Sequence, residues 1–325
     1  MAYKVLKPSE SAGIKDLVRL HSADKSDGET TSSSSQLYTP YKEEIKTAAR
    51  LIEKFSGMKV GENFKKGEIK VKFASSEEVT KVAQEELYRI VEKFIHDPHV
   101  LVQVRQLLRN EALIGEADSH GTRAGGVFIE SQNAVYVIKD SIEEAVKEQC
   151  AVRSVKPESE EGRKIERFFT LSPIVHEAIH QIIKQNNPLI GNWWTNESME
   201  IAKIYAVYVG IPIDGEIAKD IEAKVQRVRD KMDALQAVDE GIAHYLTCKV
   251  TSKLGLSHSA MRQLQMSKED DDKRITAKGI TFVEAIERKT RGENPVAIII
   301  NHPPLTMRYI DHPDEYLKDL KEGRV

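Results

Sequence analysis

The segment Leu171–Asn187, which reads LSPIVHEAIHQIIKQNN, constrains this chain more than any other stretch. Its mostly apolar residues, interrupted by few polar ones, predict a buried helix. Ser172 is expected to cap this helix and Pro173 to take its first position, where the missing N–H costs nothing. The two asparagines before Pro188 are expected to end it.

Three residues of this segment carry potential chemistry. Residues four positions apart share a helix face, so His176 and His180 can direct their imidazoles at one ion. Glu177 lies about 100° further round the axis, near enough to contact a water molecule on that ion. Two imidazoles and a carboxylate among isoleucines are costly to bury unless something compensates them. The HExxH spacing therefore predicts a divalent metal site with Glu177 as general base.

A catalytic zinc site needs a third protein ligand and one open position for water. Glu240 in the sequence VDEGIAHYL is the first candidate for this ligand. Its small neighbours Gly241 and Ala243 are expected to let its helix pack closely on the metal helix. Glu197 and Glu200 in TNESMEIAKIYA are competing carboxylates.

HEAIH followed by DEGIAHY resembles the gluzincins, zinc metallopeptidases with two histidines on an HExxH helix and a glutamate on a later helix. The resemblance implies that His176, His180 and Glu240 bind Zn²⁺ and that Glu177 is the general base. It also implies zinc-dependent hydrolysis of a peptide or protein substrate.

The family pattern also bears on the choice of third ligand. It places a small residue three positions after the glutamate, and Ala243 stands there after Glu240. Glu197 and Glu200 lack a small residue at that position. We therefore expect Glu240 to be the ligand, with the other two beside the site or on the surface.

Peptide hydrolysis further needs a donor for the oxyanion. His244, one helical turn after Glu240, and Tyr245 are the first candidates, although Tyr245 also resembles the family's packing tyrosine. His302 and Tyr309 are further candidates in the C-terminal part.

A catalytically inactive metallopeptidase-like binding or scaffold protein is the alternative to an enzyme. The intact Glu177 favours the enzyme, because a binding protein needs no base there. The sequence leaves open the substrate preference, endo- or exopeptidase cleavage and the oligomeric state.

The composition argues against several kinds of partner for this protein. The formal net charge is −3 with 30% charged residues, so no overall basic field indicates a nucleic-acid partner. The sequence contains no run of about 18 apolar residues, so no membrane partner is expected. The N-terminus lacks the apolar core of a signal peptide, and two cysteines are too few for a disulfide framework. These features favour a cytoplasmic protein.

The periodicity predicts the elements around the metal helix. Strands are expected at Glu68–Ala74, Val127–Glu130 and Ala134–Ile138, the last two joined as a hairpin. The hairpin is a candidate edge strand for pairing with an extended peptide. A long helix is expected over Asp220–Lys249, and the VAIII run that begins at Val296 looks like a strand.

Together these elements predict an α+β, gluzincin-like metallopeptidase domain, with a small mixed sheet over the HExxH helix and a helix-rich second lobe. Residues 1–40 contain a serine-rich stretch and are expected to be peripheral and partly disordered. Residues 41–190 are expected to form the sheet-containing lobe that ends in the metal helix. Residues 191–325 are expected to form the helical lobe that supplies the third ligand.

Overall fold

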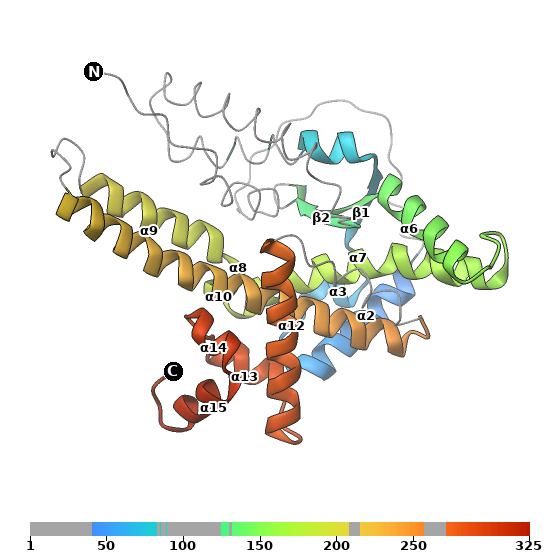
Figure 1. Ribbon diagram of the computed structural model, residues 1–325. Helices are drawn as coiled ribbons and strands as arrows, with labels where there is room; N and C mark the ends of the chain where they lie inside the picture. Colours follow the sequence, from blue (N-terminus) through green and yellow to red (C-terminus); the bar gives the residue numbers. More distant parts are fainter. Residues whose placement is uncertain are drawn as a thin grey trace, which may run out of the picture. The chain divides into compact units, whose positions relative to one another are not determined.

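The described part of the chain is mostly helical and contains a small three-stranded mixed sheet, an α+β composition (Figure 1). This is a computed structural model, and it describes residues 41–82, 85, 89, 125–129, 132–207, 215–256 and 271–325. The predicted peripheral segment 1–40 lies outside the described residues.

The described residues form two compact units. The first includes residues 69–174, and the second combines residues 41–68 with 175–325. These units differ in extent from the sequence-based lobes, because residues 41–68 group with the helical part. All the candidate metal ligands lie in the second unit.

The sheet belongs to the first unit. It consists of β1 (Lys70–Ala74), β2 (Gly126–Ile129) and β3 (Ala134–Ile138) in the order β1-β3-β2. β3 pairs in parallel with β1 and antiparallel with β2, so the predicted strands and the hairpin pairing are confirmed. β2 and β1 are the edges of the described sheet.

The sheet's core is built from alternating apolar side chains and is followed by helices. Val127 and Ile129 of β2 pack in one buried cluster with Ala134 and Tyr136 of β3. A helix begins after Ser75, whose hydroxyl accepts a hydrogen bond from the Glu78 backbone while the Glu78 carboxylate accepts one from the Ser75 backbone. The sheet is followed by α6 (Lys139–Val152).

The metal helix α7 begins earlier than predicted. It runs over Glu160–Asn186, with Pro173 inside it instead of at its start. Upstream residues Ile165, Phe168 and Phe169 are buried, so an apolar face extends the helix back through the proline. Gly125 accommodates the proline ring, since a Cβ at Gly125 would lie 2.5 Å from its Cγ.

The predicted end of the metal helix is confirmed, and the two asparagines there tie it to other segments. The Asn186 amide exchanges hydrogen bonds of 2.8 and 2.9 Å with the backbone of Lys59. The Asn187 side chain accepts from the backbone of Leu189 and donates to the Ile300 carbonyl at 2.6 Å. These contacts fix the C-terminal end of α7 within the second unit.

The second unit is helical. Its elements besides the end of α7 are α2 (Lys42–Ser56), α3 (Glu62–Lys65), α8 (Pro188–Gly191), α9 (Trp193–Val207), α10 (Gly215–Lys253), α12 (Asp271–Thr290), α13 (Pro295–Asn301), α14 (Met307–Asp311) and α15 (Pro313–Lys321). Over the described ranges, none of the helices has both the length and the apolar character that crossing a membrane requires.

The strand expected for the VAIII run is wrong, because this run forms helix α13. The Asn294 side chain accepts hydrogen bonds from the backbone of Val296 and Ala297, and Pro295 takes the first helical position. Such a cap outweighs the β-propensity of a short apolar run.

Glycines set the crossing of α10 and α12. A Cβ on Gly241 would lie 2.5 Å from the Gly279 backbone, and one on Gly279 would lie 1.8 Å from the Ala237 carbonyl oxygen. Gly241, the small residue beside Glu240, therefore packs against α12. The expectation that Gly241 packs on the HExxH helix is wrong. Gly241 lies about 100° round the axis from Glu240, so the two residues face different neighbours.

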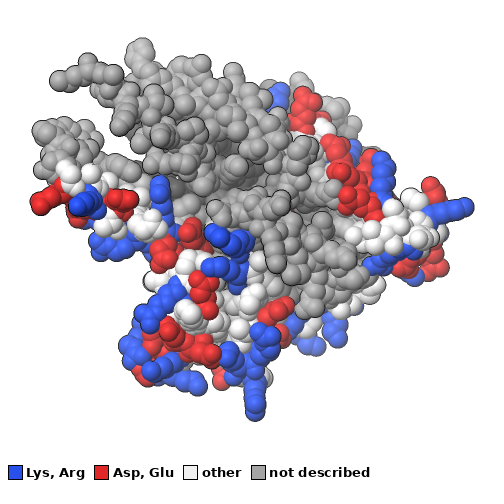
Figure 2. Space-filling model, in the orientation of Figure 1, with Lys and Arg blue, Asp and Glu red and all other residues white. Residues whose placement is uncertain are grey.

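Charged side chains are interspersed on the face drawn in Figure 2. Ion pairs within one helix of the described residues include Lys46 with Glu43 and Lys224 with Asp220. Exposed pairs of this kind contribute little to stability.

We expect Gly279→Ala to destabilise the protein by about 1–3 kcal/mol or more, since the added methyl group would overlap the α10 backbone. Gly215→Ala is the matched control, because it is also a helical glycine but a Cβ there meets no atom within 4 Å. Urea unfolding followed by circular dichroism measures both. Equal midpoints for the two variants would contradict the proposed close crossing.

Candidate metal centre

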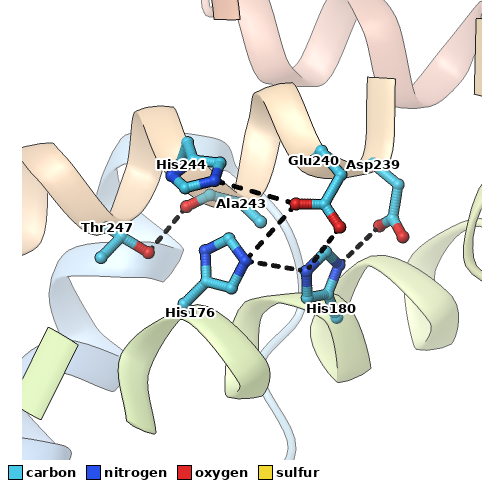
Figure 3. Close-up of polar contacts among 7 residues, drawn as sticks. All are labelled: His176, His180, Asp239, Glu240, Ala243, His244 and Thr247. Carbon is cyan, nitrogen blue, oxygen red and sulfur yellow. Dashed lines mark hydrogen bonds and ion pairs between the residues drawn. The ribbon is translucent and has the colours of Figure 1, made fainter. Parts of the chain in front are cut away.

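Two helices of the second unit supply the candidate centre (Figure 3). His176 and His180 project from successive turns of α7, and Glu240 and His244 from successive turns of α10. The two pairs face each other, with Asp239 beside His180.

The donor atoms converge at separations that suit one ion. The Nε2 atoms of His176 and His180 are 3.1 Å apart. The Glu240 carboxylate places Oε2 at 3.6 Å from His176 Nε2 and Oε1 at 3.8 Å from His180 Nε2. Ligands at 2.0–2.1 Å from a tetrahedral zinc ion are roughly 3.3–3.4 Å from one another. Glu240 thus faces His176 with one oxygen and His180 with the other, each at a separation slightly longer than that of two ligands on one zinc ion.

The centre is buried among apolar side chains. Glu240 is 4% exposed and His180 is 7% exposed, and their chain neighbours Ile179, Val238 and Ile242 are fully buried. Carboxylate–imidazole separations of 3.6 and 3.8 Å are too long for hydrogen bonds. A cation between these groups would compensate the cost of burying them.

Asp239 is a functional candidate that the sequence analysis missed. Its Oδ1 lies 3.0 Å from Nδ1 of His180, although the two do not form a well-directed hydrogen bond. A carboxylate on the far nitrogen of a metal-binding imidazole fixes the ring's orientation and raises its basicity. An acidic residue within the otherwise apolar stretch before Glu240 was the available signal.

The electrostatics of the centre favour positive charge. Burial alone would lower the pKa of His180, but the carboxylates of Asp239, Glu240 and Glu177 outweigh it and raise the pKa to about 10. A proton on His180 supplies positive charge when no metal is bound. A divalent cation that displaces this proton would balance the negative charge better, because more than one carboxylate faces the site.

Glu177 lies next to the two α7 imidazoles. Single donor atoms of His176, Glu177 and His180 all lie within 4.8 Å of one another. Glu177 is only partly buried, so water can reach its carboxylate. This is the placement expected of a base that acts on a water molecule at the ion.

His244 also joins the cluster. Its Nε2 lies 3.8 Å from Oε2 of Glu240, and its ring centroid lies 4.5 Å from that of His176. Donor atoms of His176, Glu240 and His244 all lie within 4.8 Å of one another. The predicted candidate His244 is therefore within reach of the metal position.

The other predicted donors are engaged elsewhere. The Tyr245 hydroxyl accepts a hydrogen bond of 2.5 Å from Lys249, and burial together with Glu287 raises the pKa of Tyr245. The Tyr309 hydroxyl donates to Asp319 at 3.0 Å. His302 is exposed at the end of α13. The structure does not bring these side chains into the cluster of His176 and Glu240.

The competing carboxylates also have other partners. Glu197 is buried and forms an ion pair of 2.7 Å with Lys231, and Glu200 forms one of 2.7 Å with Lys203 on its own helix. Of the three carboxylates, Glu240 is the one whose oxygens lie beside the α7 histidines.

Comparison with known proteins gives no further assignment: no protein-family model, curated protein or solved structure matches this chain.

We expect Glu240→Gln to weaken zinc binding by more than about 100-fold, the upper end of the loss that outer-shell partners alone cause. Glu200→Gln, which removes an exposed glutamate, and Glu197→Gln are expected to retain zinc. Competition with a chromogenic chelator measures the affinity, and circular dichroism confirms folding. If Glu240→Gln retains zinc and one of the other two variants loses it, the third ligand is Glu197 or Glu200 and not Glu240.

Zinc binding is expected to release about one proton from His180 near neutral pH. The pKa of about 10 keeps this imidazole protonated in the metal-free protein, and coordination requires the neutral ring. The apparent affinity should therefore rise with pH until about pH 10. Calorimetry in buffers of different ionisation enthalpy counts the protons.

Asp239→Asn is the matched variant for this titration. It removes one carboxylate that raises the pKa of His180, so it should release fewer protons and bind zinc about 10–100-fold more weakly. If the wild type binds zinc without releasing a proton, His180 does not carry a proton that zinc displaces.

Proposed function

We propose that this chain is a zinc-dependent peptidase that hydrolyses bonds in peptides or proteins with Glu177 as general base. The observation that carries the proposal is the convergence of the His176 and His180 imidazoles with the Glu240 carboxylate, next to Glu177. The resemblance of HEAIH and DEGIAHY to the gluzincin pattern supports the same reading.

The donor set favours zinc as the ion. Two imidazoles and one carboxylate, with one position left for water, are typical ligands of catalytic zinc. The same three donor types also serve non-haem iron sites. The carboxylate of Glu177 beside the ligands favours hydrolysis, because a base at this place can accept a proton from a water molecule on the ion.

Bound zinc would supply a Lewis acid that makes water more acidic and polarises the scissile carbonyl. Glu177 then accepts a proton from the attacking water and delivers it to the leaving amine as the C–N bond breaks. Asp239 holds the His180 ring so that its Nε2 faces the site. His176 and Glu240 complete the ligand set.

His244 is the group that we assign to the developing oxyanion. It is the member of the cluster on the α10 side that is neither a predicted ligand nor the base, and its side chain is 19% exposed. Tyr245 is left out, because its hydroxyl contacts Lys249. Peptide pairing along the β2–β3 hairpin stays a prediction.

Glu177→Gln is expected to lower kcat by about 10²–10⁴-fold, the contribution of a positioned acid–base group, while zinc content stays unchanged. Glu166→Gln is the matched control, since Glu166 is an exposed glutamate on the same helix. Casein and a mixed-peptide library, read by mass spectrometry, serve as substrates, and zinc is quantified in every sample.

The same experiment separates the enzyme from the alternative of a binding or scaffold protein. Zinc-loaded wild type and Glu177→Gln with identical peptide profiles would favour the scaffold. Hydrolysis that persists after complete removal of zinc would contradict a metal-dependent mechanism.

A further inference from the structure

The candidate centre contains one more donor than a hydrolytic zinc site needs. Each of the two helices contributes a pair of side chains four residues apart: His176 with His180, and Glu240 with His244 (Figure 3). Donor atoms of His176, Glu240 and His244 all lie within 4.8 Å of one another, as do those of His176, Glu177 and His180, so the two groups share His176.

His244 lies near the same Glu240 oxygen as the predicted ligand His176 does. Oε2 of Glu240 lies 3.6 Å from His176 Nε2 and 3.8 Å from His244 Nε2. Both separations exceed hydrogen-bond length, and both are close to the spacing of ligands on one ion. Nε2 of His244 therefore lies at about the spacing of two ligands from Oε2 of Glu240, which is too far for a hydrogen bond to that oxygen.

We infer that His244 is a fourth protein ligand of the metal ion in the resting protein, where it takes the position that hydrolysis requires for water. The inference rests on the proposed function, since it concerns the same metal site. Sites with four protein ligands are closed, and catalytic sites keep one position open. His244 would therefore hold the site in a latent form.

The position of His244 suits a ligand that can leave. Its side chain is 19% exposed, compared with 15% for His176, 9% for His180 and 6% for Glu240, so it is the most exposed of the four. Release of this imidazole opens the ion to water and leaves a nitrogen donor beside the reacting carbonyl, which is the role assigned to it above.

Cobalt-substituted protein tests the inference. The visible bands of Co²⁺ report the donor set and the coordination geometry. We compare wild type with His244→Ala and His244→Gln, and use His302→Ala as the matched control, because His302 is exposed outside the cluster. Each variant is titrated with Co²⁺ and with Zn²⁺, and free imidazole is then added to His244→Ala.

The expected result is a changed spectrum in both His244 variants at an unchanged stoichiometry of one ion, with zinc affinity at least about tenfold lower. Free imidazole should restore the wild-type spectrum in His244→Ala, and His302→Ala should match wild type. Superimposable spectra of wild type and a folded His244 variant would overturn the ligand role, whatever happens to the affinity.

Failure of the metal site itself gives a different result. If wild type binds no Co²⁺, or if His176→Ala binds it as wild type does, the proposed function fails together with the inference. A wild-type site that needs His176 but gives the same spectrum without His244 overturns only the inference.

Discussion

The close packing of two buried carboxylates against imidazoles is the constraint on which the rest of this structure depends. Glu240 and Asp239 are both buried and both face the α7 histidines. Carboxylates in such a place need a cation within a few ångströms. A proton on His180, whose pKa the nearby carboxylates raise, meets this need, and we propose that a divalent ion bound by several of these side chains replaces it.

The fold holds the two halves of the centre through contacts that lie outside it. Asn186 and Asn187 fix the end of α7 through hydrogen bonds to the backbone of Lys59 and Ile300, directly after the turns that carry His176 and His180. The contact of Gly241 with Gly279 fixes the rotation and position of α10 one residue after Glu240. Ligand spacing within a helix follows from the helical repeat, but spacing between helices follows from such packing.

The HExxH helix and the three strands followed from the periodicity of the sequence. The gluzincin resemblance singled out Glu240, whose oxygens the structure places beside His176 and His180, and its role as a ligand stays a prediction. The start of α7 was wrong because the buried upstream aromatic residues outweigh the effect of Pro173 within the helix. The helical VAIII run was missed although its signal is local, since Asn294 caps the helix and Pro295 takes its first position. The contact between Asp239 and His180 depended on how α10 faces α7. This contact has no periodic signal in the chain.

A crystal structure of the zinc-loaded protein, with anomalous diffraction recorded at the zinc edge, tests the central claim most directly. The account predicts one anomalous peak at about 2.0–2.2 Å from Nε2 of His176, Nε2 of His180 and a carboxylate oxygen of Glu240. A fully loaded protein with no peak within coordinating distance of these three residues would contradict it.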